Sequence, residues 1–135
     1  MKDAEQLVDE LGRLYAATAL LGPDDLHLTA TQKLALAELA GGETLRLMEL
    51  ARRIGTTDPT ASRAVDGLVT LGLVERHDDP DDRRALRLAA TAAGKRWVKR
   101  RRRLVAAALR TPLAALKPAE RRRLVELLAR LNAAL

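Results

Sequence analysis

The residues best suited to chemistry gather in one short stretch, "ERHDDPDDRRALRL", which runs from Glu75 to Leu88. Its four aspartates could ligate a calcium ion through carboxylate oxygens. A calcium loop counted from Asp78 would place Pro80 at an early ligand position and Ala89, in place of a bidentate glutamate, at the twelfth. We therefore expect no metal site, and the first interpretation of the stretch is a charged, solvated loop.

Catalytic constellations are equally scarce. The two histidines, His27 and His77, fall in a loop and beside the charged stretch, with no nucleophile at a recognisable spacing. The chain has no cysteine, which excludes disulfides, thiolate metal sites and a cysteine-oxidation switch. We expect no catalytic residue and no cofactor, so the chain is not expected to be an enzyme.

Composition indicates what kind of core must position these residues. The 135 residues suit one domain, and the apolar ones are mostly Leu, Ala and Val, with no Phe, a single Trp97 and a single Tyr15. We expect an aliphatic, largely helical core. The N-terminal segment carries acids within its apolar pattern, and no run reaches the roughly 18 apolar residues that span a bilayer. The expected location is the cytoplasm, with no membrane partner.

Charge is distributed unevenly along the chain, although the net charge is only +6. Residues 1–50 hold 4 Lys/Arg against 9 Asp/Glu, residues 51–90 hold 7 against 7, and residues 91–135 hold 13 against 2. An acidic start and a basic end are expected to attract each other, within one chain or between chains.

The first half of the chain has helical periodicity. Leu7, Leu11 and Leu14 share a stripe of a helix predicted from Ala4 to Leu21, which Gly22-Pro23 would end. Thr29 and Gln32 have the spacing of a capping box, so a second helix should run from there to Gly41-Gly42, followed by an extended piece over 44–47.

The segment "MELARRIGTTDPTASRAVDGLVTLG" predicts two short helices joined by a turn at 55–57. Ala51 lets the helices approach closely, and Gly55 tolerates positive φ in the turn. Asp58 is expected to cap the second helix, with Pro59 at its first position.

Beyond Leu73 the apolar period becomes two, and it resumes at Leu86, so two strands joined by a charged tip are expected. Thr91 should cap a long basic helix that ends at Thr111-Pro112, and a last helix should begin at Pro118. The predicted fold is mainly α with a small β-hairpin wing: a winged helix-turn-helix domain with additional N- and C-terminal helices.

The second helix of the helix-turn-helix has two distinct faces. Ala61, Val65 and Leu68 should face the core. The opposite face is polar and could enter a major groove, where an arginine pairs with guanine edges and hydroxyls meet phosphates or bases. An ordinary solvated surface is the competing interpretation. Asp66 lies on the same face and would be repelled by phosphates unless an arginine holds it. The candidate DNA-binding residues of this helix are Thr60, Ser62, Arg63 and Thr70.

The stretch from Leu50 to Gly94 resembles the signature of the MarR (multiple antibiotic resistance regulator) family of winged-helix transcription factors. Each motif is common alone, but their order and spacing are specific, and the flanking helices extend the resemblance over nearly the whole chain. The matching motifs are Leu50-Ala51, Ser62-Arg63, 65–68, 72–76, Asp79-Pro80-Asp81-Asp82-Arg83-Arg84, and Thr91-Ala92-Ala93-Gly94.

The resemblance implies a homodimeric regulator, typically a repressor, that binds a pseudo-palindromic operator in double-stranded DNA and is released by a small apolar or aromatic effector. The wing would reach the minor groove through Arg83 and Arg84, with Asp82 holding Arg84. It also implies one domain over 1–135, with dimerisation helices at 1–28 and 95–135 and a DNA-binding region at 29–94. Gly67 departs from the family, which often has a basic residue there.

Two further interpretations remain open. The basic run 95–103 could pack at a dimer interface, contact phosphate, or simply be solvated, with Trp97, Val98, Val105 and Ala108 on its inner face. Apolar stripes on the first and last helices favour a dimer, because a winged-helix core has no room for both. The alternative function is a winged-helix protein-interaction module that has lost specific DNA binding.

Overall fold

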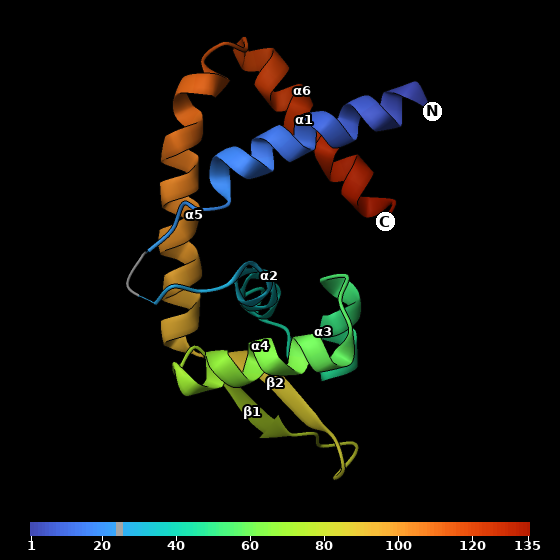
Figure 1. Cartoon of the computed structure of the whole chain (residues 1–135), viewed down its shortest axis with the longest axis vertical. Helices are drawn as coiled ribbons and strands as arrows, with labels where there is room; N and C mark the ends of the chain where they lie inside the picture. Colours follow the sequence, from blue (N-terminus) through green and yellow to red (C-terminus); the bar gives the residue numbers. More distant parts are fainter. Residues whose placement is uncertain (24–25) are drawn as a thin grey trace.

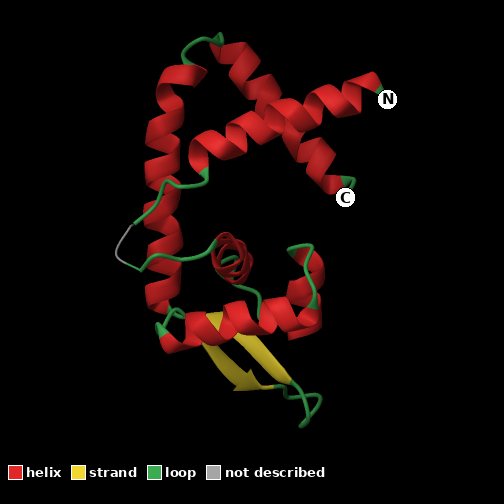
Figure 2. Ribbon diagram, in the orientation of Figure 1, coloured by secondary structure: helices red, strands yellow, loops and turns green. Residues whose placement is uncertain are grey.

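The computed structural model describes residues 1–23 and 26–135. These form helices and one antiparallel hairpin, as predicted, and the hairpin projects at the end of the molecule opposite to both termini (Figures 1 and 2). The elements are α1 (Lys2–Thr18), α2 (Ala30–Leu39), α3 (Leu47–Arg53), α4 (Asp58–Thr70), β1 (Val74–Asp78), β2 (Leu86–Ala90), α5 (Ala92–Leu113) and α6 (Pro118–Ala133).

One aliphatic core joins α2, α4, the hairpin and the start of α5. Helix α2 packs against α4, and α3 packs against α4. Trp97 is the aromatic member of this core and is 4% exposed. The largest fully buried side chains are Leu36, Leu39, Leu45, Leu50, Leu68, Val65 and Val74. The prediction of an aliphatic core is confirmed.

Local signals shape the helix-turn-helix. The capping box at α2 is present: the Thr29 hydroxyl accepts from the Gln32 N–H, and the Gln32 side chain accepts from the Thr29 N–H. Gly55 adopts φ +69° in the turn between α3 and α4, a conformation that glycine adopts without steric cost. The expected cap of α4 is wrong by one residue, because Thr57, not Asp58, accepts from the Thr60 N–H.

The hairpin pairs with the extended piece before α3 as well as within itself. Val74 pairs with Ala90 and Asp78 with Leu86. At the far side of β2, Leu45 exchanges two backbone hydrogen bonds with Leu88, at 3.0 and 2.7 Å, so the extended piece before α3 borders the wing. Thr91 caps α5 as predicted.

Helices α1 and α6 and most of α5 lie outside this core. Helix α5 extends away from the core, and α1 and α6 lie toward its far end (Figure 1). Neither α1 nor α6 has a buried residue. None of the helices within 1–23 and 26–135 combines the length and apolar character that crossing a membrane requires.

The predicted limits of these helices need correction. Helix α1 begins at Lys2 and ends at Thr18, before Gly22-Pro23. Helix α5 does not stop at Thr111-Pro112 but includes Pro112 in its last turn, because proline's own φ is helical and only one N–H bond is lost. Ala108 is exposed, so it is not on the inner face as expected.

Candidate nucleic-acid interface

The polar face of α4 is positioned by its buried face. Ala61, Val65 and Leu68 are all at most 1% exposed, so the opposite side of the helix must face solvent. Arg63 is exposed there and makes no ion pair within the described part of the chain. Such a guanidinium is free to donate in a plane to two acceptors on a base edge or phosphate.

The threonine hydroxyls of this region already have local partners. The Thr57 hydroxyl donates to the Thr60 hydroxyl oxygen at 3.0 Å. The Thr70 hydroxyl donates to the backbone carbonyl of Asp66, also at 3.0 Å. Thr60 and Ser62 are partly buried, whereas Thr70 is exposed. The structure therefore places the four predicted helix residues on or beside one surface.

The carboxylate on this face is held by an arginine. Asp66 forms an ion pair with Arg76 of β1, joining α4 to the wing. The negative charge that would oppose a phosphate is thus largely compensated. Sequence reasoning named this requirement but not the residue that meets it, because Arg76 lies ten positions away on another element.

A groove separates α4 from the wing and brings predicted residues of both elements together. Ser62 lines it from the helix, and Asp82 and Arg84 line it from the wing tip. Its volume is about 440 Å³. The remaining lining residues are Arg46, Leu47, Met48, Val65, Arg76, Ala85, Leu86 and Leu88. Of its three arginines, Arg84 is the one without a carboxylate partner among the described residues.

The tip of the wing is organised differently from the expectation. Asp82 accepts from the backbone N–H of Arg84 at 3.0 Å, and no ion pair joins their side chains among residues 26–135. Asp82 therefore shapes the backbone that carries the arginine, leaving the Arg84 guanidinium unattached. Arg83 and Arg84 are both exposed, and Arg83 does not line the groove.

Asp79 was the functional candidate that sequence reasoning missed. Its side chain is fully buried, and its Oδ2 accepts from Nε of Arg46 at 2.8 Å and lies 3.3 Å from Nε of Arg87. The backbone N–H of Asp81 donates to its other oxygen at 2.9 Å. That hydrogen bond, followed by the Arg46 guanidinium, holds the pKa of Asp79 below its usual value. Asp79 is thus not one of four equivalent surface acids.

The neighbouring side chain of Gln32 gives a structural reason for the glycine at position 67. A Cβ at this position would collide with the side-chain amide of Gln32, the residue that completes the capping box of α2. That amide ends a flexible side chain, so a larger residue would require Gln32 to move and would disturb its bond to the Thr29 N–H. Glycine at position 67 leaves the capping box in place.

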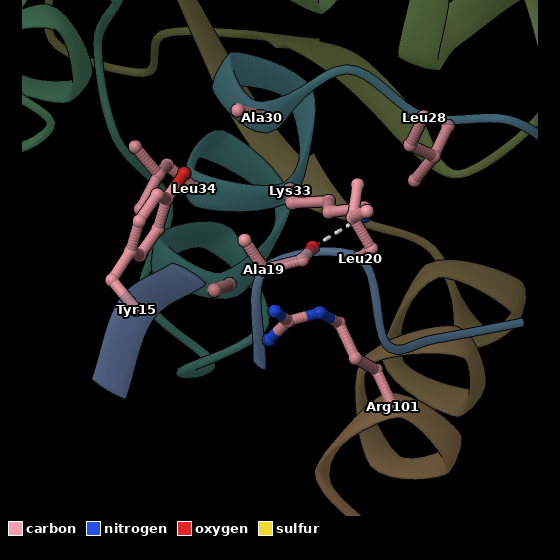
Figure 3. Close-up of a pocket in the computed structure, with 9 residues that line it drawn as sticks. Tyr15, Ala19, Leu20, Leu28, Ala30, Lys33, Leu34 and Arg101 are labelled. Atoms are coloured by element: carbon pink, nitrogen blue, oxygen red, sulfur yellow. Dashed lines mark hydrogen bonds between the residues drawn. The ribbon is translucent and has the colours of Figure 1, made fainter. Parts of the chain in front are cut away.

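A second feature lies at the junction of α1, α2 and α5, away from the wing. This hollow has a volume of about 260 Å³ and is lined by apolar side chains and two cations, Lys33 and Arg101 (Figure 3). Lys33 donates to the carbonyl of Ala19 at 3.0 Å, and Arg101 donates to the carbonyl of Thr18 at 3.5 Å. Tyr15 also lines the hollow and is 57% exposed.

An adjoining hollow of about 390 Å³ shares Lys33 and Arg101 and is also lined by Trp97 and Arg102. Nε1 of Trp97 and Nε of Arg101 are buried and have no hydrogen-bond partner in the described structure. Among residues 1–23 and 26–135, no carboxylate lines either hollow. The pair therefore offers cations and N–H donors within apolar walls.

A helix-turn-helix with an exposed arginine on its second helix, followed by a two-stranded wing, defines a winged-helix DNA-binding fold. The model of the MarR family matches residues 27–85. The chain belongs to the MarR family of transcriptional regulators. The resemblance inferred from the sequence motifs is confirmed.

Solved structures agree with this assignment. A probable transcriptional regulator from Pseudomonas aeruginosa is 30% identical, with a TM-score of 0.71 over 95% of both chains. A MarR-family regulator from Silicibacter pomeroyi is 28% identical, with a TM-score of 0.73 over 98% of this chain and 89% of that one. BpsR of Bordetella bronchiseptica, whose DNA binding is regulated by 6-hydroxynicotinic acid, is 23% identical, with a TM-score of 0.74 over 98% and 99%. No curated protein sequence matches this chain.

Proposed function

We propose that this protein is a homodimeric transcriptional repressor that binds a pseudo-palindromic operator. The observation that carries the proposal is the groove that joins Ser62 of α4 to Arg84 of the wing, with Arg63 exposed on the same helix. Helix α4 would lie in the major groove and the wing in the adjacent minor groove. Half-sites would then lie about one helical turn, ~34–36 Å, apart.

The proposed residue roles follow from chemistry and position. Arg63 reads a guanine edge, and Thr60, Ser62 and Thr70 contact phosphates or bases. Arg84 enters the minor groove, where a narrow groove concentrates negative potential, and Arg83 contacts the backbone beside it. Asp82 keeps the tip in shape through the Arg84 N–H.

The outer helices support a dimer. Leu7, Leu11 and Leu14 of α1 are 40–46% exposed, although they form an apolar stripe. Leu124, Leu127 and Leu131 of α6 are 40–45% exposed in the same way. A second copy would cover both stripes and bring acidic α1 near the basic helices, which eases their self-repulsion.

A small effector would enter at the α1, α2 and α5 junction. The unpartnered Trp97 N–H and the cations Lys33 and Arg101 favour a compact apolar or aromatic molecule that carries an anionic group. BpsR, which has the same fold, is regulated by an aromatic acid. Binding there would act on α1, one of the dimer helices, and on α5, which joins the dimer helices to the DNA-binding region.

The direct test is to select duplexes from a random pool and then compare variants on the selected site. Arg63→Ala should lose ~1–3 kcal/mol of discrimination at one base position. Arg84→Ala should lose affinity mainly for sites with a narrow minor groove. Arg53→Ala removes the same charge from an arginine already paired with Glu43 and should bind normally. Unchanged binding by both site variants, with the fold intact, would contradict the assignment.

Sedimentation tests the dimer independently. Leu11→Glu or Leu127→Glu places a charge within a stripe and should yield monomers, because burying an unpaired carboxylate is costly. Gln6→Glu, which adds the same charge at an exposed position of α1 outside the stripe, should leave the association unchanged. Monomeric wild-type protein at micromolar concentration would contradict this part of the proposal.

A further inference from the structure

One buried carboxylate attaches the start of the wing-tip turn to the segment before α3. Asp79 directly follows β1, and its side chain pairs with Arg46 from that segment and with Arg87 from β2. Arg87 also donates to the carbonyl of Thr44 at 3.3 Å. Residues 44–46 and the wing are therefore joined by charged side chains as well as by the Leu45–Leu88 backbone bonds.

The same carboxylate organises the tip. Its Oδ1 accepts from the Asp81 N–H, and the Asp79 N–H donates to the carbonyl of Ala85 at 3.2 Å. The turn that carries Arg83 and Arg84 thus begins and closes at Asp79. A displacement of this carboxylate would displace both arginines.

Arg46 connects the Asp79 ion pairs to the helix-turn-helix. Arg46 is the residue before α3, and its N–H donates to Glu49 within the first turn. Helix α3 packs on α4, the proposed recognition helix, so the position of Arg46 is fixed relative to α4. Arg46 also lines the groove shared by Ser62 and Arg84.

We propose that Asp79 is a positioning residue for DNA binding: through Arg46 and Arg87 it fixes the wing tip relative to α4. The proposal rests on the function proposed above, because a fixed spacing between Arg63 and Arg84 matters only if both contact one duplex. Two arginines paired with one buried carboxylate fix both the orientation and the distance of the wing tip relative to α4, because charge-assisted hydrogen bonds are directional and a hydrophobic contact is not. Without the carboxylate, Arg46 and Arg87 face each other as like charges, and the Asp81 N–H loses its charged acceptor, so only the backbone bond from Asp79 to Ala85 still holds the turn.

Because the chain has no cysteine, two introduced cysteines can be labelled specifically. The distance between the labels then reports the position of the wing tip without DNA. Arg83→Cys at the tip and Arg52→Cys on the exposed side of α3 accept two nitroxide labels, and excess unlabelled protein restricts the measurement to one chain per dimer. The expected result is one narrow distance distribution with Asp79 and a broadened or shifted one with Asp79→Asn. Asp78→Asn makes the same charge change at an exposed neighbour and should leave the distribution unchanged.

Duplex binding completes the test. Asp79→Asn should weaken binding by about tenfold and remove the wing's minor-groove protection in a hydroxyl-radical footprint, while major-groove protection by α4 persists. A purely structural role would weaken both protections together and would overturn the proposal, as would a distance distribution like that of Asp78→Asn. Arg46→Gln, which removes one donor from a partly exposed position, should give the same pattern if Asp79→Asn fails to fold. If wild-type protein binds no duplex, the proposed function fails, whereas the distances still decide whether Asp79 fixes the tip.

Discussion

The carboxylate of Asp66, on the recognition helix, is ion-paired with the guanidinium of Arg76, on the first strand of the wing. An acid on a surface proposed to meet phosphate is thereby compensated by a residue of the neighbouring element. The pair also links the two parts of the interface, α4 and the wing.

Removing Arg76 should therefore reduce duplex affinity. Arg76→Ala leaves Asp66 uncompensated near phosphates, which should cost ~1 kcal/mol, or roughly fivefold in affinity, at moderate salt. The double variant Asp66→Asn/Arg76→Ala should recover most of that loss, because the repelling charge is gone. Fluorescence anisotropy with one labelled duplex measures all three proteins, and failure of the second change to restore binding would show that Arg76 itself contacts DNA.

The cap of α4 gives a prediction about stability. Thr57→Ala should destabilise the protein by about 1 kcal/mol, because the Thr60 N–H loses its acceptor. Asp58→Ala should cost less, about 0.3–1 kcal/mol, since Asp58 contributes only its charge near the helix N-terminus. Urea unfolding of both variants measures the two losses in free energy of unfolding. A larger loss for Asp58→Ala would support Asp58, the cap predicted from the sequence.

Two glycines in helices should respond in opposite directions to alanine. A Cβ on Gly94 would collide with the backbone carbonyl of Leu73 and lie 3.1 Å from the Leu36 side chain, so Gly94→Ala should destabilise by ~1–3 kcal/mol or more. Gly12 has no atom within 4 Å of such a Cβ, so Gly12→Ala should stabilise α1 by ~0.5–1 kcal/mol. Thermal unfolding of the pair at one protein concentration provides the comparison.

Low pH should destabilise the folded protein by protonating Asp79. Its pKa is lower in the folded protein than in the unfolded chain, chiefly through the Asp81 N–H and then Arg46. The folded state therefore gains stability above the unfolded pKa of about 3.9 and loses it as pH falls through the folded value. Asp79→Asn should be less stable than wild type at neutral pH, and the difference should shrink below pH ~4. Unfolding midpoints at several pH values, with Asp78→Asn as control, measure this, and a pH-independent difference would contradict it.

Sequence signals with a local physical cause predicted the fold well. The capping box of Thr29 and Gln32, the Thr91 cap and the glycine turn at Gly55 each depend on residues within four positions. The helical period then predicted the core face of α4 correctly, and the period of two predicted the hairpin. These features need no knowledge of distant partners.

The missed features depend on distant partners. The burial of Asp79 is set by Arg46, thirty-three residues earlier, so four adjacent aspartates looked equivalent in sequence. The partly buried Arg101 likewise reflects tertiary context, because its guanidinium donates to the Thr18 carbonyl, 83 positions away. Arg63, Arg83 and Arg84 could be proposed as a site because exposed arginines on a winged helix have few other structural roles, and their contacts with DNA stay a prediction.

Salt dependence of duplex binding tests the central claim most directly. If Arg63, Arg84 and neighbouring groups neutralise phosphates, the logarithm of affinity should fall linearly with the logarithm of salt concentration, with a slope of about −0.9 per phosphate contact. Wild-type protein should show a steep fall between ~50 and ~200 mM salt, and Arg84→Ala should reduce the slope by about one. Binding that is insensitive to salt, or equally sensitive in the two proteins, would contradict the account.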